Sequence, residues 1–93
     1  MINSFRDKET KKIFSGEFSK KFPAEIQPRA LYRLEMLNNA VNIDDLKVPS
    51  SNHLEALSGN RLGQFSIRVN DKYRVCFEWI NNCAENVELV DYH

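Results

Sequence analysis

The stretch QFSIRVNDKYRVCFEW, residues 64–79, alternates apolar and polar side chains on both sides of a short polar break. Its apolar members are Phe65, Ile67 and Val69 before the break, and Tyr73, Val75, Phe77 and Trp79 after it. Strict alternation is typical of antiparallel strands that bury one face. The stretch therefore predicts a β-hairpin whose apolar face, including the lone tryptophan, belongs to the core.

The length of the turn fixes the register of this hairpin. If the turn comprises residues 70–72, Val69 lies opposite Tyr73 and apolar side chains meet apolar ones all along the pair. A two-residue turn would set apolar against polar positions, which a one-sided core forbids. The three-residue turn also places Arg68 directly opposite Arg74.

This arginine pair indicates either a neutralising carboxylate or an external anion. Like charges directly opposite in a sheet are destabilising by up to about 1 kcal/mol. Glu78 or Glu88 could neutralise the pair, which is the purely structural interpretation. The functional interpretation is a phosphate clamp, because guanidinium groups bind phosphate bidentately and keep their charge. Arg61, in the glycine-flanked segment SGNRLG (58–63), would supply a third cation.

The segments before the hairpin have helical rather than alternating patterns. RDKETKKIFSG (6–16) is a short helix closed by a glycine, and FPAEIQPRALYRLEMLNNA (22–40) has the strongest helical period. The apolar stripe of the second helix is Ile26, Ala30, Leu34, Leu37 and Val41; Phe14, Phe18 and Phe22 recur every four residues and are expected to pack. Residues 2–5 could form a short strand, and NVELVDYH (86–93) a third strand. Helices followed by a meander predict one α+β domain over residues 1–93: a small antiparallel sheet with two N-terminal helices packed on one face.

Composition narrows the class of protein. A run of about 18 apolar residues is lacking, and the start MINSFRDKETKK is too charged for a secretory signal, so a cytoplasmic protein is expected. Cys76 and Cys83 match no zinc motif, and no metal or cofactor is expected. The formal net charge is zero, yet residues 1–33 carry eight basic and four acidic side chains. That basic half could meet a polyanion or could be a solvated helix face.

The final residues, ELVDYH (88–93), place an acid, a phenol and an imidazole in a row. Three proton-exchanging groups suggest acid–base chemistry. Alternation, however, puts Asp91 and His93 on one face of the last strand and Tyr92 on the other. The structural alternative is that Tyr92 packs, Asp91 pairs with an arginine, and His93 frays.

Taken together, LEALSGNRLGQFSIRVNDKYRVCFEW (54–79), the terminal DYH and the opening INSF with KETKKIFSG resemble the HigB toxins of the RelE/ParE superfamily, and most closely their GraT-like branch. The resemblance implies a ribosome-dependent mRNA interferase, an endoribonuclease that cuts messenger in the ribosomal A site. It also implies a HigA-like helix-turn-helix antitoxin, which binds the toxin and carries it to operator DNA.

Carried over by position, the functional residues of that family are Arg74, Asp91, Tyr92 and His93 as the catalytic set, with Arg61 and Arg68 as substrate contacts. Glu55 and Ser58 stand where many relatives have a histidine and a lysine, so the acid–base assignment stays open. Relatives are usually basic, and this chain is neutral, so ribosome binding would depend on a local patch. Lys20, Lys21, Arg29 and Arg33 are the expected patch.

Two other function classes remain compatible with the sequence. One is a ParE-like toxin acting on a target other than RNA, such as gyrase. The other is a non-catalytic module whose partner is a helix-turn-helix repressor. The acid–phenol–imidazole set and the arginine pair favour the ribonuclease, because neither alternative requires them.

Overall fold

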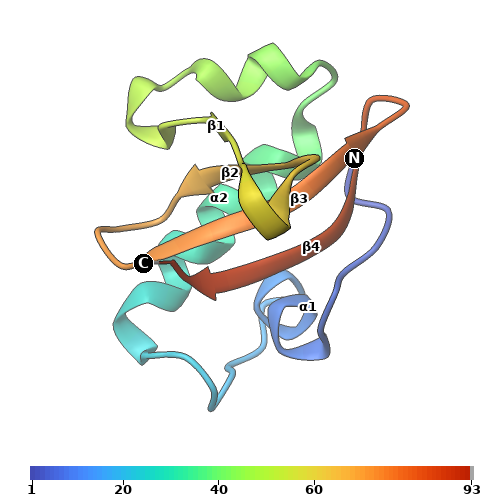
Figure 1. The fold of residues 1–93 in the computed structure, drawn as a ribbon. Helices are drawn as coiled ribbons and strands as arrows, with labels where there is room; N and C mark the ends of the chain where they lie inside the picture. Colours follow the sequence, from blue (N-terminus) through green and yellow to red (C-terminus); the bar gives the residue numbers. More distant parts are fainter. Residues whose placement is uncertain (93) are drawn as a thin grey trace.

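The computed structural model describes residues 1–92 as two layers, a four-stranded antiparallel sheet and a pair of α-helices (Figure 1). The α-helices are α1 (Lys8–Phe14) and α2 (Gln27–Asn39), and the 3₁₀ helices are η1 (Ala24–Ile26), η2 (Ile43–Lys47), η3 (Ser50–Asn52) and η4 (Gly59–Arg61). The strands are β1 (Glu55–Ala56), β2 (Gln64–Arg68), β3 (Tyr73–Ile80) and β4 (Cys83–Asp91), side by side in chain order. The predicted α+β class is confirmed.

Local sequence explains where both helices begin. The Asp7 side chain caps α1 by accepting from the backbone N–H of Thr10 at 3.1 Å. Pro28 lies in the first turn of α2, where its missing N–H costs no helical hydrogen bond. Among residues 1–92 no helix is long and apolar enough to cross a membrane.

The prediction that Val41 and Phe18 pack in the core was wrong. Val41 follows the end of α2 at Asn39 and is 74% exposed, so the buried stripe ends at Leu37. Phe18 lies after α1 has ended and is 62% exposed, whereas Phe22 is buried and Phe14 packs against the core. In both cases the helix is shorter than the run of apolar spacing that predicted it.

The hairpin has the predicted register. Phe65 pairs with Phe77, Ile67 with Val75, and Arg68 lies opposite Arg74. The apolar face of β2 and β3 packs against α2, where Ala30, Leu34 and Leu37 are fully buried. Because apolar residues occupy every second position of both strands, this register buries Ile67, Val69, Tyr73, Val75 and Phe77 and packs the partly buried Phe65 and Trp79 against them.

Both edges of the sheet differ from the prediction. Residues 2–5 form isolated parallel bridges, Ile2 with Ala84 and Phe5 with Val87, instead of a strand. At the other edge, the two residues of β1 add a fourth strand that alternation could not reveal. The pairing of β3 with β4 is irregular between Cys76 and Glu78, and Asn86 there has a φ of 52°. Such an irregularity changes which side chains of β4 face the helices.

Candidate functional site

The face of the sheet turned away from the helices carries polar and charged side chains from three strands. We call it the arginine face, and its members are Gln64, Ser66, Arg68, Arg74, Cys76, Glu78 and Glu88. The segment between β1 and β2 crosses this face, as Figure 1 shows for the yellow turn in front of β3 with α2 behind it. That turn is η4, and it brings Arg61 onto the arginine face.

Arg74 is held firmly on this face. Its Nε donates a hydrogen bond to Ser66 Oγ at 2.7 Å, and its Nη2 donates to the backbone carbonyl of His53. Ser66 is fully buried, and the Arg74 side chain is only 12% exposed. The carboxylate of Glu55 approaches Nη2 at 3.9 Å. Two hydrogen bonds on neutral acceptors therefore fix the direction of the guanidinium while leaving its charge largely uncompensated.

Arg61 is tied to the last strand. Its Nη1 donates to Glu88 Oε1 at 2.9 Å and to Gln64 Oε1 at 3.0 Å. The hydrogen bond to Glu88 raises the pKa of the Arg61 guanidinium above its usual value, against the opposing effect of burial.

The carboxylates near the opposed arginines are not the two that the sequence suggested. Arg68 binds Asp71, a residue of the hairpin turn, and Arg74 has Glu55 as its neighbour. Asp71 is 97% exposed. An exposed pair of this kind contributes at most about 1 kcal/mol, so a phosphate can replace the carboxylate at little cost.

Glu78 and Glu88 instead belong to a second charged network on the same face. Arg6 Nε lies 3.5 Å from Glu88 and its Nη2 lies 3.9 Å from Glu78. Glu88 also holds Arg61. Glu88 thus links β4 to the N-terminal segment through Arg6 and to η4 through Arg61.

Of the three predicted residues at positions 91–93, the structure describes Asp91 and Tyr92. Asp91 lies opposite Tyr73, on the helix side, and its carboxylate is 3.6 Å from Lys72 Nζ rather than beside an arginine. The backbone N–H of Tyr92 donates to the Lys72 carbonyl at 2.8 Å, and alternation directs its side chain toward the arginine face. His93 lies outside the described residues.

The four basic residues predicted as one patch lie on two elements. Lys20 and Lys21 precede η1, and Lys21 has its ammonium 4.0 Å from Asp7 and over the ring of Phe22. Arg29 and Arg33 are four residues apart on α2, so they share one side of that helix.

Sequence reasoning missed two residues beneath the arginines. Ser66 holds Arg74, and Cys76 lies fully buried on the same face. Burial raises the pKa of the Cys76 thiol, with the Arg61 charge opposing the rise, so the thiol stays protonated near neutral pH and is a poor nucleophile. Alternation in the sequence places both residues on the polar face of the sheet. It does not predict that they are buried, because their burial depends on η4 covering that face.

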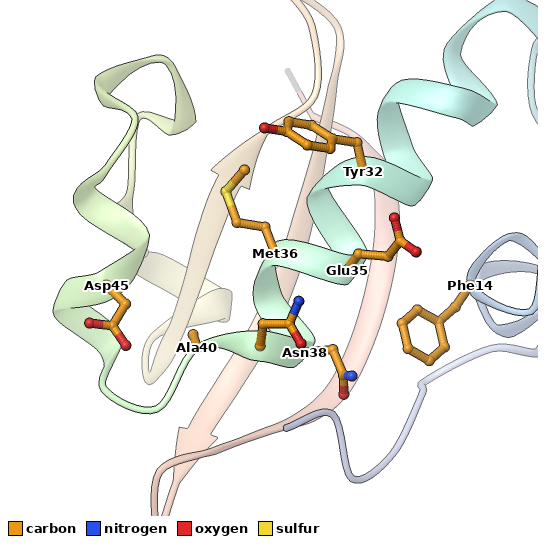
Figure 2. A pocket seen from close by; sticks show the side chains of 8 residues that line it. Phe14, Tyr32, Glu35, Met36, Asn38, Ala40 and Asp45 are labelled. Atoms are coloured by element: carbon orange, nitrogen blue, oxygen red, sulfur yellow. The ribbon is translucent and has the colours of Figure 1, made fainter.

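A separate groove of about 670 Å³ lies on the helix side of the molecule. Figure 2 shows Phe14 of α1, Tyr32, Glu35 and Met36 of α2, and Asp45 of η2 around it. Its charged groups are carboxylates, which repel phosphate. The groove itself is therefore unsuited to binding phosphate.

Nearly the whole chain is matched by a known family. A model of RelE-like toxins of the HigB type II toxin–antitoxin system matches residues 3–93. The chain belongs to the HigB-like toxin family. Toxin HigB-1 of Vibrio cholerae serotype O1 is 34% identical to this HigB-like chain over 90 residues, which are 96% of this chain and 95% of the relative. Endoribonuclease HigB of Proteus vulgaris is 33% identical over 93 residues, the full length of both.

Solved structures show the same fold at low sequence identity. The YoeB–YefM complex from Staphylococcus aureus contains a chain that superposes with a TM-score of 0.62 and 15% identity, covering 100% of this chain and 98% of the other. A YafQ variant from E. coli gives a TM-score of 0.62 at 11% identity, covering 98% and 93%. These structures confirm the plan of a small sheet with helices on one face, and the family model and the two HigB relatives confirm the resemblance to the HigB toxins.

Proposed function

We propose that this HigB-like toxin is an endoribonuclease that cuts translated messenger RNA on the ribosome and so inhibits growth. The observation that carries the proposal is the convergence of Arg61, Arg68 and Arg74 on one face of the sheet. The name of the Proteus vulgaris relative, which aligns over the full length, supports the same activity.

The chemistry needs three kinds of group. A base removes the proton of a ribose 2′-hydroxyl, whose oxygen attacks the adjacent phosphorus. Cations stabilise the charge that grows on the phosphate oxygens. An acid protonates the departing 5′-oxygen, which leaves a 2′,3′-cyclic phosphate on the upstream fragment. Side chains alone can supply all three groups, so the proposal includes no metal or cofactor.

The cationic role falls to the arginines. Arg74 binds a phosphate oxygen, because Ser66 and the His53 carbonyl already fix its guanidinium and little reorganisation is needed. Arg68, opposite Arg74 in the hairpin, binds the same phosphate after its ion pair with the exposed Asp71 has broken. Arg61 contacts the substrate from η4.

The proton-transfer roles fall to residues 91–93. His93 acts as acid or base, because the ordinary pKa of histidine is near neutrality. Asp91 serves as a base or orients its partner, and Tyr92 stacks on a nucleobase or donates a proton. Asp91 and Tyr92 point to different sides of β4, so the RNA backbone would pass around the end of that strand to meet both.

Partners follow from the same proposal. A HigA-like helix-turn-helix antitoxin neutralises the toxin and links it to operator DNA. The Staphylococcus aureus YoeB structure, solved with YefM, supports an antitoxin partner. Lys20, Lys21, Arg29 and Arg33 contact ribosomal RNA in the cytoplasm, because a chain of zero net charge depends on local cations.

Induced expression with mapping of messenger 5′ ends tests the proposal. The native chain should produce cuts within translated codons, and a chain lacking residues 91–93 should not. Arg74→Lys keeps the charge but loses the two-pronged geometry, so it should cut far more weakly. Lys12→Ala, which changes an exposed cation of α1 paired with Glu9, is the matched control and should cut normally.

Two results would contradict the proposal. Altered DNA supercoiling with intact messenger would indicate a ParE-like target. Unimpaired growth, with the chain bound to a helix-turn-helix protein, would indicate a non-catalytic module.

A further inference from the structure

Three arginines from two distant parts of the chain share one neighbourhood at the edge of the molecule. Arg29 and Arg33 lie on the same side of α2, and Arg68 is the last residue of β2. Burial lowers the pKa of the Arg33 guanidinium, and the positive charges of Arg29 and Arg68 lower it further. Geometry links Arg33 to the hairpin as well: Arg33 donates to Asn52, and Arg74, directly opposite Arg68, donates to the carbonyl of the adjacent His53.

The position of Arg33 is built into the core. Its Nη1 donates to Asn52 Oδ1 and its Nη2 donates to Ser51 Oγ at 3.4 Å. Asn52 is fully buried, and its own amide donates to the Leu46 carbonyl at 3.1 Å. The guanidinium also lies 5.7 Å from the centroid of the Tyr32 ring. All of these contacts are with neutral groups, so they fix the direction of the guanidinium without compensating its charge.

Carboxylates do little to compensate this cluster. Within residues 1–92, neither Arg29 nor Arg33 forms an ion pair, and the partner of Arg68 is the almost fully exposed Asp71. Gathering like charges at a partly buried position is unfavourable unless an anion is bound there. Guanidinium groups suit phosphate in particular, because their parallel N–H groups match two phosphate oxygens.

We propose that Arg29, Arg33 and Arg68 form a second phosphate-binding site, separate from Lys20 and Lys21, for a backbone phosphate of RNA. The inference rests on the proposed function and extends the proposed RNA-binding surface. Arg68 is opposite Arg74 in the hairpin, so the new site continues the arginine face around the edge of the sheet to α2. The phosphate belongs either to messenger beside the cut or to ribosomal RNA, which present the same chemistry.

The decisive variant places a carboxylate in the site without removing anything from the core. Ser51 is exposed and its hydroxyl faces Arg33, so Ser51→Asp supplies an internal anion that competes with phosphate. Ser51→Asn has almost the same size and no charge, and it is the matched control. Arg29→Gln, at an exposed position, removes one cation and tests the site from the opposite direction.

Binding is measured on ribosomes in two arms. One arm carries messenger with 2′-deoxynucleotides in the A-site codon, which cannot be cut because the attacking hydroxyl is absent. The other arm carries messenger that ends before the A site. Ser51→Asp and Arg29→Gln should each weaken binding about tenfold, as expected for one charged contact. The slope of log affinity against log salt should also fall, by about 0.7 per lost contact with single-stranded RNA.

The arms identify the source of the phosphate. If the variants lose affinity only for ribosomes with messenger in the A site, the site binds messenger. If they lose affinity equally in both arms, the site binds ribosomal RNA. Unchanged affinity and salt slope for Ser51→Asp and Arg29→Gln in both arms would overturn the inference, while native cutting would leave the proposed function standing. If the native chain cuts no messenger, the proposed function fails and the inference fails with it.

Discussion

Removing the hydroxyl of Ser66 should impair cleavage by releasing Arg74. The Ser66 side chain is fully buried and its Oγ accepts the hydrogen bond from Arg74 Nε at 2.7 Å. In Ser66→Ala this Nε, on a side chain only 12% exposed, loses its partner and gains little water. Such an unpaired group costs about 1–3 kcal/mol. If that cost falls on the alignment of Arg74 in the transition state, the cleavage rate drops between about fivefold and a hundredfold.

The assay separates positioning from folding. Single-turnover cleavage of ribosome-bound messenger is followed at saturating toxin, and urea unfolding gives the folded fraction of each variant. Ser4→Ala is the matched control, because Ser4 Oγ also bonds a charged group, Glu85 Oε1 at 2.8 Å, at the N-terminal edge of the sheet. Ser4→Ala should lose stability and keep its rate. A native rate for fully folded Ser66→Ala would refute the reasoning.

Three further predictions concern single side chains. Glu88→Gln should strengthen RNA binding severalfold in a filter assay, because Arg61 loses its carboxylate partner, and it should lower the urea midpoint. Two backbone N–H groups lower the pKa of Asp45, so its contribution to stability is present above the ordinary carboxyl pKa, about 4, and is lost as the pH falls through the lower folded pKa. In an acid titration followed by circular dichroism, Asp45→Asn should therefore lose folded structure less steeply with falling pH than the native chain does. Mass spectrometry after iodoacetamide treatment should find Cys83 alkylated in the native chain, whereas Cys76, whose thiol is buried and protonated, reacts only after unfolding.

Much of the site could be predicted because it lies on one hairpin. Alternation over residues 64–79 fixes which side chains share a face, and a three-residue turn then leaves one register that buries the apolar set. The opposition of Arg68 and Arg74 follows from that register alone. The same rule placed Asp91 on the helix side of the sheet, where it lies opposite Tyr73.

The contacts that orient the arginines could not be predicted, because they join segments whose distance the sequence does not encode locally. η4 folds across the sheet and brings Arg61 to Glu88, 27 residues further along the chain. β1 has only two residues, too few to show a period, yet it places Glu55 beside Arg74.

The amino-acid sequence was sufficient to predict the class of fold, the hairpin register and the HigB-like family, because periodicity and motif spacing are properties of neighbouring residues. The pairing of carboxylates with arginines depends on tertiary packing, and so does the contact of Arg33 with Asn52, next to the His53 carbonyl that binds Arg74. Asn52 illustrates why these contacts could not be predicted. It is buried, it donates to the Leu46 carbonyl of η2, and it accepts a hydrogen bond that fixes the direction of Arg33. Its burial depends on how whole elements pack against one another.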